Sequence, residues 1–134
     1  MSPRTHPRAL GVGALLGLAG WVPLVLLGGE AHVTAAAVLL AAVAGVYLGF
    51  AVADGRTSSL LVESVVILVF VGVAFVAIDQ DLGWLVGVGF LGHAAWDGLH
   101  HSGGGPTAVR PWYPPFCAAV DVLIAVPLLA GWGA

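Results

Sequence analysis

Long apolar runs cover almost the whole chain, and they limit what it can fold into. Five such runs occupy positions 9–28, 32–53, 60–78, 82–101 and 116–132. A helix needs about 20 apolar residues to cross the hydrocarbon core of a bilayer. Only 8% of the 134 residues are charged, whereas an average soluble domain has about a quarter. The sequence therefore predicts an all-α integral membrane protein, a single domain over residues 1–134 with five transmembrane helices.

The arginines set the expected orientation of these helices. All four lie on one side of the predicted bundle, namely Arg4, Arg8, Arg56 and Arg110 in the segments 1–8, 54–59 and 102–115. The segments on the other side, 29–31 and 79–81, hold only acidic charges. Basic loops stay in the cytoplasm, so we predict a cytoplasmic N-terminus, an external C-terminus and a multi-pass protein of the plasma membrane.

The fourth apolar run ends in a polar stretch that a lipid-facing helix would not carry. At about 100° per residue, His93, Asp97 and His100 fall within about 60° of one another on one helix face. His101 lies at the edge of that sector, about 80° from His93. A charge in hydrocarbon costs several kcal/mol. This face must therefore meet polar partners from other helices.

Candidate partners lie at a similar depth in the predicted bundle. With a rise of 1.5 Å per residue, Asp97 lies about 6 Å and His93 about 12 Å inside the cytoplasmic end of the fourth run. On the same basis Glu63 lies about 5 Å inside its own run, and Asp121 about 8 Å inside the fifth. The sequence thus predicts one polar cluster in the cytoplasmic half of the membrane.

A divalent metal ion is the first interpretation of this cluster. Imidazole nitrogens and carboxylate oxygens suit zinc, with iron or manganese as alternatives. We predict that the ligands come from four residues, His93, His100, His101 and Asp121. The bound ion would lower the pKa of a water molecule, and Glu63 or Asp97 would accept its proton as the catalytic base. This mechanism predicts a hydrolase that acts on a lipid-like substrate at the cytoplasmic leaflet.

Two other interpretations of the same residues stay open. Intramembrane ionisable groups also relay protons or line ion paths, and they hold helices together through hydrogen bonds alone. Either function would make the protein a non-enzymatic subunit or an ion-handling module. Cys117 lies one turn before Asp121 and could join the cluster, but we interpret it as a small packing residue.

Glycine pairs at four-residue spacing indicate how helices approach one another. The pairs are Gly13/Gly17, Gly45/Gly49 and Gly83/Gly87. Small residues at this spacing allow close packing within a membrane, so these faces offer a route to a homo-oligomer. The expected partners are the lipid bilayer and a lipid-like substrate. The chain has no basic stripe of the kind that binds nucleic acid.

Two segments of the last third carry a resemblance to known proteins. They are His93-x-x-Trp96-Asp97-x-x-His100-His101 and Tyr113-Pro114-x-x-Cys117-x-x-x-Asp121. In them the sequence resembles a group of small multi-pass membrane proteins of bacteria and archaea, which implies that these residues act as one unit but implies no activity. A looser likeness is to membrane metal hydrolases of the alkaline ceramidase type, which place His, Asp and Ser around zinc. The chain lacks the His-x-x-x-His pair of those enzymes.

Overall fold

Five α-helices form the part of the chain that the structure describes. The computed structural model describes residues 6–132, and all regular structure in that range is helical. The helices are α1 (Pro7–Leu27), α2 (Gly29–Asp54), α3 (Thr57–Asp79), α4 (Gly83–His101) and α5 (Tyr113–Leu129). These bounds confirm the all-α prediction, and each differs from the predicted run by at most three residues. Arg4, which we used to predict the orientation, lies outside the described residues.

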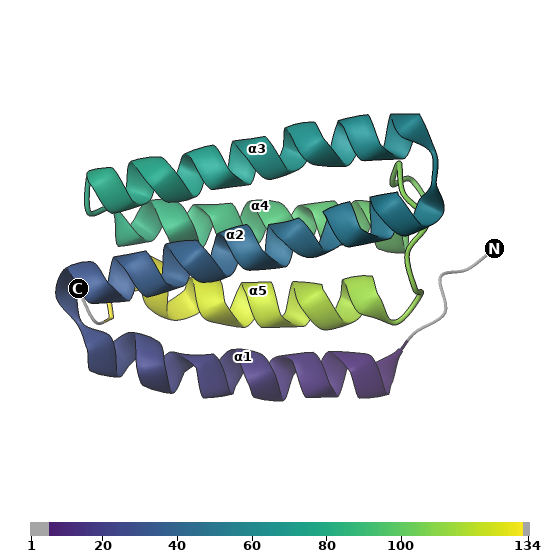
Figure 1. The fold of residues 1–134 in the computed structure, drawn as a ribbon. Helices are drawn as coiled ribbons and strands as arrows, with labels where there is room; N and C mark the ends of the chain where they lie inside the picture. Colours follow the sequence, from purple (N-terminus) through teal and green to yellow (C-terminus); the bar gives the residue numbers. More distant parts are fainter. Residues whose placement is uncertain (1–5, 133–134) are drawn as a thin grey trace.

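Short connections make consecutive helices antiparallel (Figure 1). Gly28, with φ of +64°, stands alone between α1 and α2, and Gly55, with φ of +75°, ends α2 before α3. Such a left-handed backbone favours glycine, which has no Cβ to clash. The longest connection is the segment 102–112 between α4 and α5. We call the end of the bundle that holds this segment the loop end, and the opposite end, where α1 meets α2 and α3 meets α4, the turn end (Figure 1).

Three helices have the length and composition of membrane spans. These are α1, α2 and α3, each 21 or more residues long and strongly apolar. Their outward side chains include Leu26, 79% exposed, and Phe75, 69% exposed, which water would solvate poorly and lipid would solvate well. The chain is therefore a helical protein of the membrane type. That α4 and α5 also cross, and that the N-terminus is cytoplasmic, stay predictions.

The last helix lies between the first and the fourth (Figure 1). A Cβ added at Gly13 of α1 would lie 2.3 Å from the backbone carbonyl oxygen of Phe116, so only glycine permits this approach to α5. Gly87 of α4 likewise packs against α5. In contrast, Gly45 and Gly49 of α2 have open space beside them. Two of the predicted glycine faces thus serve packing inside the chain, and the predicted homo-oligomer stays a prediction.

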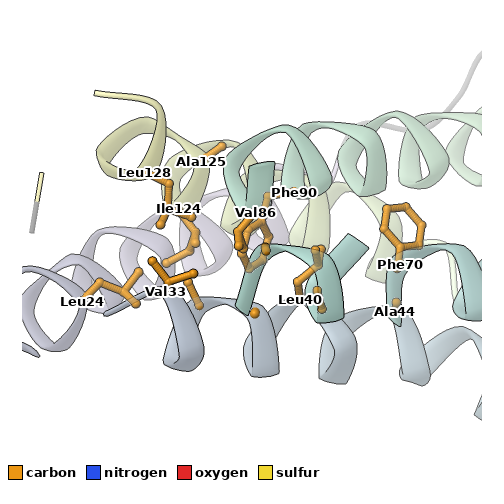
Figure 2. Packing of buried hydrophobic residues seen from close by; sticks show 14 residues of the cluster. Leu24, Val33, Leu40, Ala44, Phe70, Val86, Phe90, Ile124, Ala125 and Leu128 are labelled. Carbon is orange, nitrogen blue, oxygen red and sulfur yellow. The ribbon is translucent and has the colours of Figure 1, made fainter. Parts of the chain in front are cut away.

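The apolar core occupies the turn end and the middle of the bundle (Figure 2). It runs from Leu24 and Leu128 at the turn end to Phe70 of α3. Phe90 of α4 lies at its centre with no exposed surface. Beyond Phe90 towards the loop end, the inward side chains of α4 become polar. The core therefore stops where the candidate site begins.

Candidate functional site

A single stripe along α4 faces the interior of the bundle. Val86, Phe90, His93, Asp97 and His100 follow one another at spacings of four and three residues, and all five are buried. Residues three and four apart share a face of an α-helix. The stripe is apolar at the turn end and polar at the loop end. This change of character brings three ionisable side chains into the bundle interior.

The first group of polar residues joins α4 to α5, and we call it the α4–α5 cluster. It consists of His93, Asp97, Cys117 and Asp121, each of which offers a metal-ligand atom within 4.8 Å of the others. His93 Nδ1 lies 2.6 Å from Asp121 Oδ2 and 3.7 Å from Asp97 Oδ2. None of the four side chains is more than 2% exposed. The cluster is therefore a closed site, cut off from solvent by the surrounding helices.

The α4–α5 cluster is short of hydrogen-bond partners. The Tyr47 hydroxyl of α2 donates to Asp97 Oδ1 at 2.5 Å. Three buried atoms, His93 Nε2, Asp97 Oδ2 and Asp121 Oδ1, have no hydrogen-bond partner within residues 6–132. A buried polar atom without a partner costs about 1–3 kcal/mol. A further ligand could supply the missing partners.

A metal ion fits the donor set of this cluster. Imidazole, thiolate and carboxylate are the three ligand types that zinc takes in proteins. Ligand atoms about 2.0–2.3 Å from a tetrahedral ion lie about 3.3–3.8 Å from one another. The cluster atoms, all within 4.8 Å of one another, would need to close by only about 1 Å. The arrangement can therefore hold an ion without rearrangement of the helices.

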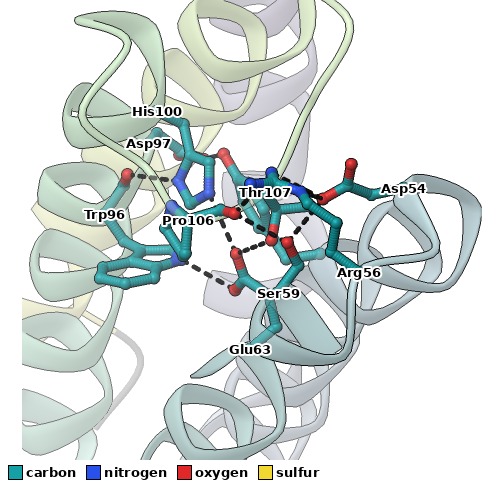
Figure 3. Close-up of polar contacts among 10 residues, drawn as sticks. Asp54, Arg56, Ser59, Glu63, Trp96, Asp97, His100, Pro106 and Thr107 are labelled. Carbon is teal, nitrogen blue, oxygen red and sulfur yellow. Dashed lines mark hydrogen bonds and ion pairs between the residues drawn. The ribbon is translucent and has the colours of Figure 1, made fainter. Parts of the chain in front are cut away.

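A second polar group surrounds Glu63 near the loop end, and we call it the Glu63 network (Figure 3). Glu63 Oε1 accepts from the Thr107 hydroxyl at 2.7 Å and lies 3.0 Å from His100 Nε2. Its Oε2 accepts from the Trp96 indole at 3.1 Å. The network thus joins α3, α4 and the segment 102–112. The contact with Thr107 is the one through which the segment 102–112 bonds to the Glu63 carboxylate.

Both ring nitrogens of His100 have a hydrogen-bond partner in this network. His100 Nδ1 lies 3.0 Å from the Trp96 carbonyl, which can only accept, so Nδ1 carries a proton. The other ring nitrogen, Nε2, lies within hydrogen-bond and salt-bridge distance of Glu63 Oε1. Both ring nitrogens of His100 are therefore engaged, and neither is free to bind a metal.

Polar contacts hold the segment 102–112 against the start of α3 (Figure 3). The Pro106 carbonyl accepts from Arg56 at 2.9 Å and lies 2.8 Å from the Ser59 hydroxyl. Arg56 also pairs with Asp54 at 2.8 Å. The hydrogen bond to Asp54 and its charge raise the pKa of the Arg56 guanidinium above its usual value. Arg56 therefore stays charged and holds the segment against α2 and α3.

Tyr47 connects the two polar groups. Its hydroxyl donates to Asp97 in the α4–α5 cluster. Its ring lies 4.4 Å, between centroids, from the ring of His100 in the Glu63 network. Sequence reasoning missed Tyr47 because an aromatic residue in an apolar helix resembles any other core residue. A hydroxyl that must find a partner when it is buried was the available signal.

The predicted site residues divide between these two groups. His93, Asp97 and Asp121 lie together in the α4–α5 cluster, whereas Glu63 and His100 lie in the network. His101 is half-buried, outside both. His93 and His100 are seven residues apart, about 10.5 Å along the helix axis, which is too far for a shared ion in this arrangement. Cys117 packs with Tyr47 and Tyr113 in a buried cluster, which agrees with its interpretation as a packing residue, and it also offers a candidate ligand atom, as its one-turn spacing to Asp121 allowed.

These features define the class of protein. The chain is a small helical protein of the membrane type with a buried polar centre that can hold a metal ion. It belongs to a family of unknown function, DUF6010, whose model matches residues 11–133. No curated protein and no solved structure matches the chain. The function must therefore be argued from the site itself.

Proposed function

We propose that this protein is an integral membrane protein that binds one divalent metal ion in the α4–α5 cluster. The observation that carries the proposal is the set of unpartnered buried atoms on His93, Asp97 and Asp121, within a group that also contains a cysteine. Zinc is the ion that such a mixed nitrogen, sulfur and oxygen donor set favours. An ion bound there would supply a partner for the free carboxylate oxygens of Asp97 and Asp121.

The closed geometry favours a structural or ion-holding function over hydrolysis. A catalytic zinc keeps one position open for water, whereas a structural zinc takes four protein ligands. The α4–α5 cluster offers four ligand atoms, and its side chains are at most 2% exposed. A lipid-like substrate has no room at such a site unless the helices separate. The predicted hydrolase activity gains no support from this arrangement.

The metal would join α4 and α5, the two helices that carry the candidate ligands. α4 and α5 pack along their length, and each provides two of the four candidate ligands. Structural zinc sites contribute directly to folding free energy. We therefore expect metal binding to raise the stability of the α4–α5 pair, in the way a disulfide does in a secreted protein.

Metal content of the purified protein tests the proposal. We expect about one equivalent of zinc in wild-type protein in detergent, measured by elemental mass spectrometry, with losses in His93→Gln and Cys117→Ala. His101→Gln is the matched control, because His101 lies on the same helix outside the cluster, and it should retain the metal. Wild-type protein without metal after purification and after incubation with zinc would contradict the proposal. So would equal metal content in all three variants.

A further inference from the structure

A pocket at the turn end contains two polar side chains that belong neither to the α4–α5 cluster nor to the Glu63 network. It has a volume of about 250 Å³ and lies between the α1–α2 turn, the α3–α4 turn and the end of α5. Its polar side chains are His32 and Asp81, and its wall includes Trp84, Val33 and Leu129. Water occupies about 30 Å³ per molecule in the liquid. The pocket can therefore accept a group of several heavy atoms.

His32 presents a hydrogen-bond acceptor to this pocket. The side chain is buried, with 2% of its surface exposed, and Nδ1 lies 2.5 Å from the Leu24 carbonyl oxygen. A carbonyl only accepts, so Nδ1 carries the proton, and in the neutral ring Nε2 holds a lone pair. No described residue donates a hydrogen bond to Nε2. In the neutral ring, a donor on a ligand in this pocket could therefore bond to Nε2.

Asp81 supplies a negative charge on the same pocket. It occupies the α3–α4 turn with φ of +52°, and its exposed carboxylate lines the cavity. Glu30 and Asp79 lie at this end of the bundle as well. The described arginines, Arg8, Arg56 and Arg110, all lie towards the loop end. A cation is the ligand that this charge distribution attracts.

Trp84 adds an aromatic surface and indicates the level of the membrane. Its side chain is 54% exposed and forms part of the pocket wall. Tryptophan concentrates where lipid headgroups meet the hydrocarbon core, and its ring face attracts cations. Val33 and Leu129 make the rest of the wall apolar. The pocket thus combines the features that recognise the charged end of an amphiphile.

We propose that this pocket binds a primary ammonium group, from a lipid headgroup or from a free amine. The ammonium would donate to His32 Nε2 and to the Asp81 carboxylate while it lies beside the Trp84 ring. A quaternary ammonium has no N–H and cannot make these bonds. A zinc ion needs about three or four protein ligands, and the pocket offers only two side chains of the right kind.

Native mass spectrometry of the full chain in neutral detergent tests the proposal. At pH 8, above the usual titration range of histidine, phosphatidylethanolamine should bind at least about tenfold more tightly than phosphatidylcholine with the same acyl chains. Asp81→Asn should reduce that preference by about tenfold. Asparagine tolerates the left-handed backbone of position 81, so the turn should persist. Asp79→Asn is the matched control, because Asp79 lies just before the turn but does not line the pocket.

Free ethanolamine distinguishes the two sources of the amine. If ethanolamine displaces the lipid and choline does not, the pocket recognises the amine of the headgroup. If ethanolamine binds wild-type protein but not Asp81→Asn, while neither lipid is preferred, the natural source is a soluble amine. Equal binding of N-methylated and unmethylated ligands would overturn the proposal, as would equal behaviour of the Asp81 and Asp79 variants. Failure of the metal proposal would leave this result untouched, because the α4–α5 cluster lies elsewhere in the bundle.

Discussion

The buried ion pair of the Glu63 network offers the sharpest test of the site. Glu63→Gln keeps the shape of the side chain but removes its charge. The carboxylate has no exposed surface and accepts hydrogen bonds from His100, Thr107 and Trp96. After the substitution the ring of His100 faces a neutral amide. If the amide nitrogen of the new glutamine takes the place of Oε2, the Trp96 indole N–H also loses its acceptor.

Two estimates bound the expected loss of stability. Removal of one partner from a buried ion pair costs about 3–5 kcal/mol in soluble proteins. Hydrogen bonds between membrane helices average only about 0.6 kcal/mol each, so three of them give a lower bound of about 2 kcal/mol. We therefore expect Glu63→Gln to lower the free energy of unfolding by about 2–4 kcal/mol. Replacement of His100 in the Glu63→Gln background should then cost at least about 1 kcal/mol less than in wild type.

Unfolding in mixed micelles with increasing SDS, followed by far-UV circular dichroism, measures these differences. Ser64→Ala is the control: Ser64 is the next residue of α3, and its hydroxyl bonds only to the carbonyl of its own helix. It should change stability by less than about 0.5 kcal/mol. If Glu63→Gln behaves like Ser64→Ala, or if the two replacements are additive, the network contains no ion pair of structural importance.

Three further substitutions test packing and polar contacts, the first by the same unfolding assay. Gly13→Ala should destabilise by more than about 1 kcal/mol, because the new Cβ meets a backbone carbonyl of α5, whereas Gly11→Ala, with open space beside it, should not. Gly105→Ala should displace the segment 102–112, since its Cβ would lie 2.3 Å from the His100 ring, and faster proteolysis of that segment should report it. Tyr47→Phe should lower the free energy of unfolding by about 1–2 kcal/mol and weaken zinc binding. It removes the hydrogen-bond donor to Asp97 Oδ1, so that neither oxygen of this carboxylate has a partner. Unchanged zinc affinity in this variant would show that the Tyr47 hydroxyl does not contribute to the metal site.

Much of the fold could be predicted because the membrane simplifies the problem. Every apolar run of sufficient length had to become a helix, since a spanning segment must satisfy its own backbone hydrogen bonds. The errors lie at the helix ends. α5 begins at Tyr113, three residues before the predicted start, because Pro114 and Pro115 fit the first turn of a helix, where no N–H is needed. α3 likewise begins before its apolar run, at Thr57.

The membership of the polar site could be predicted only in part. Helical periodicity and depth predicted that His93, Asp97 and Asp121 lie close together, and in the structure they do. The division between two polar groups depends on how α3 is rotated about its axis and on where the segment 102–112 returns to the bundle. Neither is encoded in spacing along one helix. Thr107, which lies in that segment, therefore had no signal in the sequence that linked it to Glu63.

The two polar groups together explain how α4 can lie inside an apolar bundle. Its inward stripe carries His93, Asp97 and His100, and each would be costly against lipid. α5 supplies Asp121 as the partner of His93, α2 supplies Tyr47 as the partner of Asp97, and α3 supplies Glu63 as the partner of His100. α4 is thus stable at its position only after all three neighbours are in place. It follows that assembly of α4 is coupled to α2, α3 and α5, and that a bound metal would act on the step in which α5 closes the cluster.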